Sequence, residues 1–325
     1  MRNSIASLFI AAALWVVVGN ANAQQGKYPS DFNVALEQGG DLWQALPPKF
    51  GNQLASPPLA SQPQNIPQIT PITSTDDNKV LRQVSISKGF INLVNHLSHA
   101  KAVDRVRPGY FDQYVQNLTR VAGDNFDVQP PVIEDACFWK DDVMNDQASC
   151  FNQMIGLMVA INFSHHYLGH FEKYAPKMAG PGNTTVPIND LLSPAEWEAS
   201  VKFGATDALT CALRAEGAMA LFDAIDKMPR RPAWTEVIVP KNIDLKQLNK
   251  ELLEYQNEFD KGGLKFSMLD KFQFRPAWDQ PSLMGLAQKT FDGGPAFLTI
   301  IQRPMIDIHA DELIGQVPAH VPGVL

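Results

Sequence analysis

The sequence lacks the features of a membrane-spanning, nucleic-acid-binding or disulfide-stapled protein. After residue 23, no apolar run reaches the roughly 18 to 20 residues that cross a bilayer. The chain has 27 lysines and arginines against 34 aspartates and glutamates, a net charge of −7, and no basic stripe that would follow a phosphate backbone. It has only three cysteines. We therefore expect no membrane span in the mature chain and no nucleic-acid partner.

Several catalytic and cofactor motifs are also missing. The sequence has no G-x-S-x-G elbow for a serine nucleophile, no C-x-x-C-H for covalent haem, and no P-loop or dinucleotide-binding glycine pattern. It also lacks the two E-x-x-H motifs of a di-iron bundle. The sequence therefore gives no motif-based support for any of these chemistries.

The first 23 residues have the pattern of a secretory signal peptide. Arg2 is followed by an apolar run over residues 5–18 and by the A-x-A cleavage signal Ala21-Asn22-Ala23. We therefore expect a periplasmic or secreted protein. In such an oxidising compartment, Cys137 and Cys150 are close enough in sequence to form a disulfide around an acidic loop, which leaves Cys211 unpaired.

Residues 24–77 differ in composition from the rest of the chain. They contain eight prolines together with many Gln, Ser and Asn residues, a composition that opposes helices and central strands. We expect a mostly irregular, extended proline-rich arm that contacts a protein partner in the cell envelope.

Residues 78–325 predict a mainly α-helical domain with a central apolar helix and few short strands. Apolar residues recur at helical spacing from Val80 towards Pro108, again after Gly109, and over 245–259. Ser193-Pro194-Ala195-Glu196 combines a helix N-cap with a capping box. The most apolar segment, 154–174, predicts the buried central helix, and the best strand candidates are 235–239 and 298–301.

That central helix ends in NFSHHYLGHFE, which holds three of the seven histidines of the chain. His166 and His170 are four residues apart, so on a helix they share one face, whereas His165 is rotated by about 100°. A buried imidazole is costly without a partner. A metal ion, a carboxylate or a backbone carbonyl would each serve.

The segment VAINFSHHYLGHFEKYA resembles the active-site helix of gluzincin-type zinc metallopeptidases, in which an apolar run leads into H-E-x-G-H. In that family a glutamate on a later helix is the third ligand, and Glu216 in RAEGAMALFD matches it best. The resemblance implies a zinc ion bound by His166, His170 and Glu216.

The sequence departs from that family at Tyr167, which replaces the glutamate that activates the zinc-bound water. A phenol with a pKa near 10 is a poor base at neutral pH, but it can orient a substrate or donate a hydrogen bond. We therefore expect the base to come from elsewhere: His99 is preferred, and His165 and Glu172 are alternatives. His96, three residues before His99, and His309, in IDIHADEL, are further candidate ligands, although both also fit ordinary helix-edge or surface positions.

Three functional hypotheses follow. The first is an exported zincin-like hydrolase with an atypical active site, acting on an unknown small-molecule or peptide substrate. The second is a non-catalytic periplasmic helical protein that serves binding or scaffolding. In the third, the histidines are core residues hydrogen-bonded to carboxylates, with no metal.

Overall fold

The computed structural model describes residues 28–266 and 269, apart from 77–78, 124–125, 127–129, 179–185 and 267–268. The predicted signal peptide, His309 and the strand candidate 298–301 lie outside the described residues. No described helix combines the length and the apolar character that a bilayer crossing requires.

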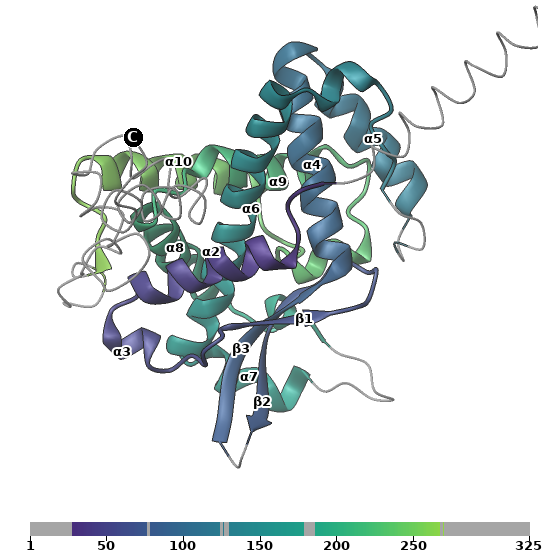
Figure 1. Cartoon of the computed structure of the whole chain (residues 1–325). Helices are drawn as coiled ribbons and strands as arrows, with labels where there is room; N and C mark the ends of the chain where they lie inside the picture. The colour runs from purple at the N-terminus through teal and green to yellow at the C-terminus, as the bar shows by residue number, and fades with distance from the viewer. Residues whose placement is uncertain are drawn as a thin grey trace, which may run out of the picture.

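The fold is mainly helical, as predicted, with a three-stranded sheet at one end of a helical bundle (Figure 1). The helices and strands in chain order are α2 (Phe32–Ala45), α3 (Pro48–Gly51), β1 (Leu59–Gln62), β2 (Ile69–Asp76), β3 (Lys79–Ser87), α4 (Lys88–Val106), α5 (Tyr110–Ala122), α6 (Asp141–Tyr167), α7 (His170–Met178), α8 (Pro194–Thr210), α9 (Ala215–Lys227) and α10 (Leu245–Asp260).

Helix α6 is the centre of the bundle. It packs against α2, α4, α8 and α9 (Figure 1), and every residue from Met154 to Tyr167 is buried. A helix that is apolar on nearly all faces has no side to present to water, so it occupies the middle of the fold. Helices α6 and α8 approach each other closely at Gly204 of α8. A Cβ atom added at Gly204 would lie only 2.7 Å from the backbone nitrogen of Ile161 in α6.

The prediction of a helix from Val80 onward is wrong, because residues 79–87 form strand β3 of the sheet. Its strand order is β1-β3-β2, with β1 parallel and β2 antiparallel to β3. Val84 and Ile86 of β3 are two residues apart and both fully buried, which is the spacing of side chains on one face of a strand, whereas Val80 near the start of β3 is exposed. The helix begins only at Lys88, where the Ser87 hydroxyl accepts a hydrogen bond from the Phe90 N–H.

The expectation of a mostly irregular arm over 24–77 is wrong for its described part. Helix α2 is capped by Asp31 and buries Ala35, Leu42 and Ala45 completely in the main core. The prolines occupy positions that secondary structure tolerates: Pro47 precedes α3, and Pro71 lies in the edge strand β2. Composition therefore misjudged this segment, because a proline at the start of a helix or in an edge strand does not interrupt the element.

Helix ends were predicted better than strands. The capping box at Ser193 and Glu196 is present, α4 ends at Val106 before Pro108, and α10 matches the predicted helix over 245–259. Residues 235–239, predicted as a strand, instead overlap a 3-10 helix over Ala233–Val237.

The predicted disulfide is also wrong, because Cys137, Cys150 and Cys211 are all free thiols. The segment expected to be an acidic loop contains the start of α6 at Asp141, so Cys150 lies nine residues into a helix. At 1.5 Å per residue this places Cys150 about 13 Å along the helix axis from Asp141, whereas Cys137 lies in a 3-10 helix over Ala136–Trp139, before the start of α6. The Cys150 thiol instead faces the Gly217 carbonyl, 3.9 Å away.

Candidate functional site

The histidine segment does not form one continuous helix. Helix α6 ends at Tyr167, and Gly169 has the left-handed φ of +77° that commonly terminates helices. The Leu168 and Gly169 N–H groups close the end of α6 on the carbonyls of Ser164 and His166. His170 then begins α7, so the four-residue spacing does not place His166 and His170 on one helix face.

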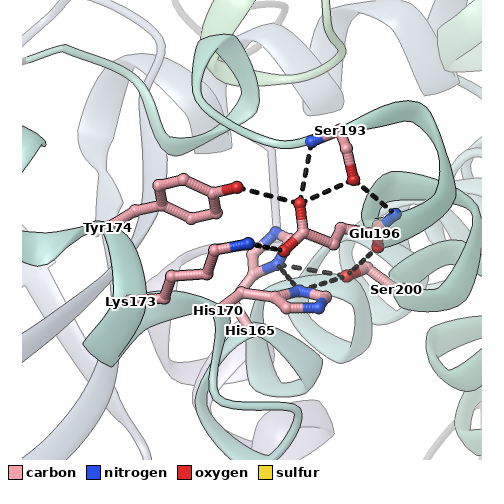
Figure 2. A network of polar contacts seen from close by, with 7 residues as sticks. All are labelled: His165, His170, Lys173, Tyr174, Ser193, Glu196 and Ser200. Carbon is pink, nitrogen blue, oxygen red and sulfur yellow. Dashed lines mark hydrogen bonds and ion pairs between the residues drawn. The ribbon is translucent and has the colours of Figure 1, made fainter.

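His165, rather than His166, pairs with His170. Their Nδ1 atoms are 3.5 Å apart, and the Ser200 hydroxyl oxygen lies 3.2 Å from Nδ1 of His165 and 3.1 Å from Nδ1 of His170 (Figure 2). Ser200 is fully buried, and His165 and His170 are 1% and 7% exposed. Three helices, α6, α7 and α8, thus each contribute one polar side chain to what we call the His165–His170–Ser200 cluster.

Glu196 fixes the surroundings of this cluster. Its backbone carbonyl accepts a hydrogen bond from the Ser200 hydroxyl at 3.0 Å. Its carboxylate accepts hydrogen bonds from Lys173 at 2.7 Å, Tyr174 at 2.9 Å and both donors of Ser193 (Figure 2). Partial burial raises the pKa of Glu196, but these donors outweigh it and lower that pKa to about 2. The ionised carboxylate therefore ties α7 to the start of α8.

The imidazoles of the cluster are neutral at ordinary pH. Burial, followed by the neighbouring His170 and His166, lowers the pKa of His165 to about 3. Burial also lowers the pKa of His170, against the opposing effect of Glu196. A neutral imidazole has one ring nitrogen with a free lone pair, so it can accept a hydrogen bond or bind a metal ion.

His166 has a different partner. Its Nε2 lies 2.9 Å from the Gln83 carbonyl of β3, so the Nε2–H donates to that oxygen. Burial lowers the pKa of His166 to about 4 despite this hydrogen bond, and its Nδ1 is buried without a partner. His166 therefore connects the central helix to the sheet.

Glu216 is not brought to the histidines. Its side chain is 58% exposed and accepts a hydrogen bond from Gln256 of α10 at 2.7 Å. Within the described part of the chain, no group of three or more His, Cys, Asp or Glu side chains is arranged to hold a metal ion. Residues 211–214 separate α8 from α9, so the face on which Glu216 lies could not be read from the residues before the break.

The two predicted catalytic residues lie in separate environments. Tyr167 stacks on Phe50, with ring centres 4.5 Å apart, and its buried hydroxyl has no hydrogen-bond partner. His99 is fully buried; its Nε2–H donates to the Phe138 carbonyl at 2.7 Å, and its Nδ1 lies 3.1 Å from the Tyr28 hydroxyl. Both side chains serve the packing of other helices rather than the His165–His170–Ser200 cluster.

The remaining candidates are also engaged elsewhere. Nδ1 of His96 lies 3.3 Å from the same Tyr28 hydroxyl that contacts His99. Glu172 of α7 forms an ion pair with Arg82 of β3 at 2.6 Å.

Sequence reasoning missed Ser200. The available signal was weak: Ser200 lies four residues after the capping-box Glu196, hence on the same face of the predicted helix. Its proximity to two histidines follows from how α8 packs on α6, which no local pattern shows.

No protein-family model matches this sequence, and neither the curated proteins nor the solved structures contain a match to it.

Proposed function

We propose that this chain is an exported helical protein that binds a transition-metal ion, with zinc as the first candidate, at the His165–His170–Ser200 cluster. One observation carries the proposal: the two Nδ1 atoms and the Ser200 oxygen lie 3.1, 3.2 and 3.5 Å from one another. Zinc–nitrogen bonds of about 2.0–2.1 Å place neighbouring ligand atoms of a tetrahedron about 3.3–3.4 Å apart. The three atoms therefore have the spacing of one face of a zinc site.

The surroundings suit a cation in charge as well as in spacing. Imidazole nitrogen is a good ligand for zinc, copper and nickel. A buried cation needs compensating negative charge, and the Glu196 carboxylate, although paired with Lys173, is close enough to His170 to affect its pKa. The chain thus supplies two nitrogen ligands, a hydroxyl and a nearby anion.

The same geometry favours a structural or regulatory ion over a hydrolytic one. Hydrolysis requires a substrate to reach the ion, and the three cluster residues are between 0% and 7% exposed. It also requires a base, whereas the side chains of Tyr167 and His99 are occupied in other parts of the core. On this proposal, the ion would join α6, α7 and α8. The resemblance to gluzincins remains a likeness of sequence and contributes no ligand set to the proposal.

A metal-free binding or scaffold protein is the second candidate. It is favoured by the hydroxyl of Ser200, which can donate to the Glu196 carbonyl while its oxygen accepts an N–H from each imidazole. Hydrogen bonds alone would then satisfy the cluster.

Zinc content and zinc affinity distinguish the two candidates. Protein purified without a histidine tag should contain one zinc per chain by elemental analysis. His165→Asn and His170→Asn should each weaken zinc binding by at least about tenfold, the smallest loss usually seen when even an outer partner of a metal ligand is removed. Titration calorimetry on the apo-protein measures the change.

His166→Asn and Glu216→Gln are the matched controls. Each removes a ligand predicted from the sequence, and each should leave zinc affinity unchanged. Circular dichroism confirms that every variant is folded. A wild-type protein that binds no zinc would support the metal-free candidate. Loss of zinc in both controls but not in His165→Asn would instead support the ligand set predicted from the sequence.

A further inference from the structure

A groove lies beside the start of α8. Two adjoining hollows of about 440 Å³ and 210 Å³ share Pro194, Trp197 and Ile243 as lining residues. The groove runs between the first turns of α8 and the segment 240–248 that leads into α10. Its size is in the range of known small-ligand sites.

Two buried polar atoms at this groove have no hydrogen-bond partner among the residues that the structure describes. Trp197 is 3% exposed, and its Nε1–H donates to no acceptor. Asn189 is 6% exposed; its Nδ2 donates to the Glu236 carbonyl at 3.2 Å, but its Oδ1 accepts nothing. Such unpaired groups are rare and costly, so one donor and one acceptor here require an explanation.

Both walls of the groove are held rigidly. The Arg231 guanidinium donates to the carbonyls of Pro240, Lys241 and Ile243 at 2.8–3.2 Å, which fixes the segment before α10. On the other wall, the capping box fixes the first turn of α8. A preformed site loses little conformational entropy when it binds.

The charges along the groove are unequal. Glu198, Asp244 and Glu251 line the smaller hollow. The larger hollow is lined by Asp190 and by one lysine, Lys241, which is paired with Glu236 at 3.1 Å. The smaller hollow therefore favours a positively charged group.

We propose that this groove binds a short extended peptide that carries a basic residue. A peptide carbonyl would accept the Trp197 Nε1–H, and a peptide N–H would donate to Asn189 Oδ1, so one stretch of main chain would satisfy both orphan atoms. Apolar peptide side chains would contact Leu192, Pro194 and Ile243, and the basic side chain would lie at the acidic hollow. Both orphan atoms are shielded from water, and binding brings them into reach through the side-chain shifts that accompany most complexes. This inference is independent of the proposed metal site.

The indole N–H of Trp197 gives a direct readout. The full mature chain, labelled with ¹⁵N, is titrated with the capped peptides Ac-Leu-Pro-Lys-NH₂ and Ac-Leu-Pro-Glu-NH₂ while indole cross-peaks are followed by NMR. The lysine peptide should shift the Trp197 cross-peak. Those of Trp43, Trp139 and Trp234, whose indoles already donate to carbonyls, should stay in place. Substituting glutamate for lysine in the peptide should weaken binding by about two- to fivefold, the range of an exposed ion pair.

Two variants test the two halves of the proposal. Trp197→Phe keeps an aromatic ring but removes the donor, and should weaken the lysine peptide. Glu251→Gln should remove most of the preference for lysine, whereas Glu254→Gln, on the same helix but outside the groove, should not change it. A stationary Trp197 cross-peak at saturating peptide overturns the proposal, and so does equal binding of the two peptides. Because Glu251 is near the surface, its variant remains informative even if Trp197→Phe does not fold.

Discussion

Asp207 and Tyr167 show how polar groups are buried in this core without partners. Within the described part of the chain, neither carboxylate oxygen of Asp207 has a hydrogen bond, and the residue is completely buried. Burial raises the pKa of Asp207 well above its usual range. Burial, and then the proximity of Asp207, raises the pKa of the Tyr167 phenol as well. Since an ionised carboxylate would be very costly there, Asp207 is a neutral acid in the folded protein.

Replacing Asp207 by asparagine should therefore stabilise the protein, increasingly so at higher pH. The folded state keeps the Asp207 proton above the pH at which the unfolded chain loses it, so folding binds a proton and stability falls as pH rises. Asparagine has the same shape and does not titrate, so Asp207→Asn avoids this loss. We expect a gain of about 1–3 kcal/mol in the free energy of unfolding at pH 8, and a smaller gain at pH 5.

Urea unfolding at pH 5 and pH 8 measures this difference. Glu198→Gln, an exposed change on the same helix, is the control and should stay within about 0.5 kcal/mol of wild type. A pH-independent loss of stability in Asp207→Asn would mean that the carboxylate has a partner and is ionised in the fold.

At the scale of elements, local sequence signals determine where a helix ends, whereas tertiary contacts determine which side chains of the helix meet other elements. The Ser193 cap, the proline after α4 and the periodicity of α10 were all legible in the sequence. Gly169 is of a residue type that commonly terminates helices, but the prediction rested on the i, i+4 spacing of the histidines and did not consider it. That single left-handed residue changes the partner of His170 from His166 to His165. The role of Ser200 could not be predicted, because it depends on the packing of two helices.

Two glycines in helices give opposite predictions. At Gly204, an added Cβ would lie 2.7 Å from the nitrogen and 2.9 Å from the Cα of Ile161 on α6. Because backbone atoms cannot yield cheaply, Gly204→Ala should cost about 1–3 kcal/mol. At Gly40 in α2, no described atom outside the adjoining residues and the local helix backbone lies within 4 Å of the added Cβ, so Gly40→Ala should raise stability by about 0.5–1 kcal/mol.

Thermal denaturation of the two variants side by side checks this pair. A neutral Gly204→Ala would indicate that α6 and α8 are farther apart than described here.

At the scale of the whole molecule, the proline-rich N-terminal segment belongs to the core. Its composition predicted an independent arm, but its helix α2 packs against α6 and α8. The mainly helical class and the central apolar helix were predictable because they depend on periodicity. The sheet and the docking of α2 were not, because they depend on contacts between distant segments.

A truncated chain that begins at Lys79 should therefore lose its cooperative thermal transition. It lacks α2, β1 and β2, and each buried side chain that is removed costs about 1.5–3 kcal/mol, against a total stability of about 5–15 kcal/mol for an ordinary domain. In the full chain, Leu42→Ala should cost about 2–5 kcal/mol, and the exposed change Glu37→Gln should cost little. A sharp transition in the truncated chain would show that the segment is a separable arm after all.

The central claim, a metal site made by His165, His170 and Ser200, is tested most directly by locating the ion. Crystals of untagged protein grown with zinc can be measured on both sides of the zinc absorption edge. We predict one anomalous peak per chain, about 2.0–2.1 Å from Nδ1 of His165 and Nδ1 of His170. A peak at His166 and Glu216, or no peak within the His165–His170–Ser200 cluster, would contradict the proposal.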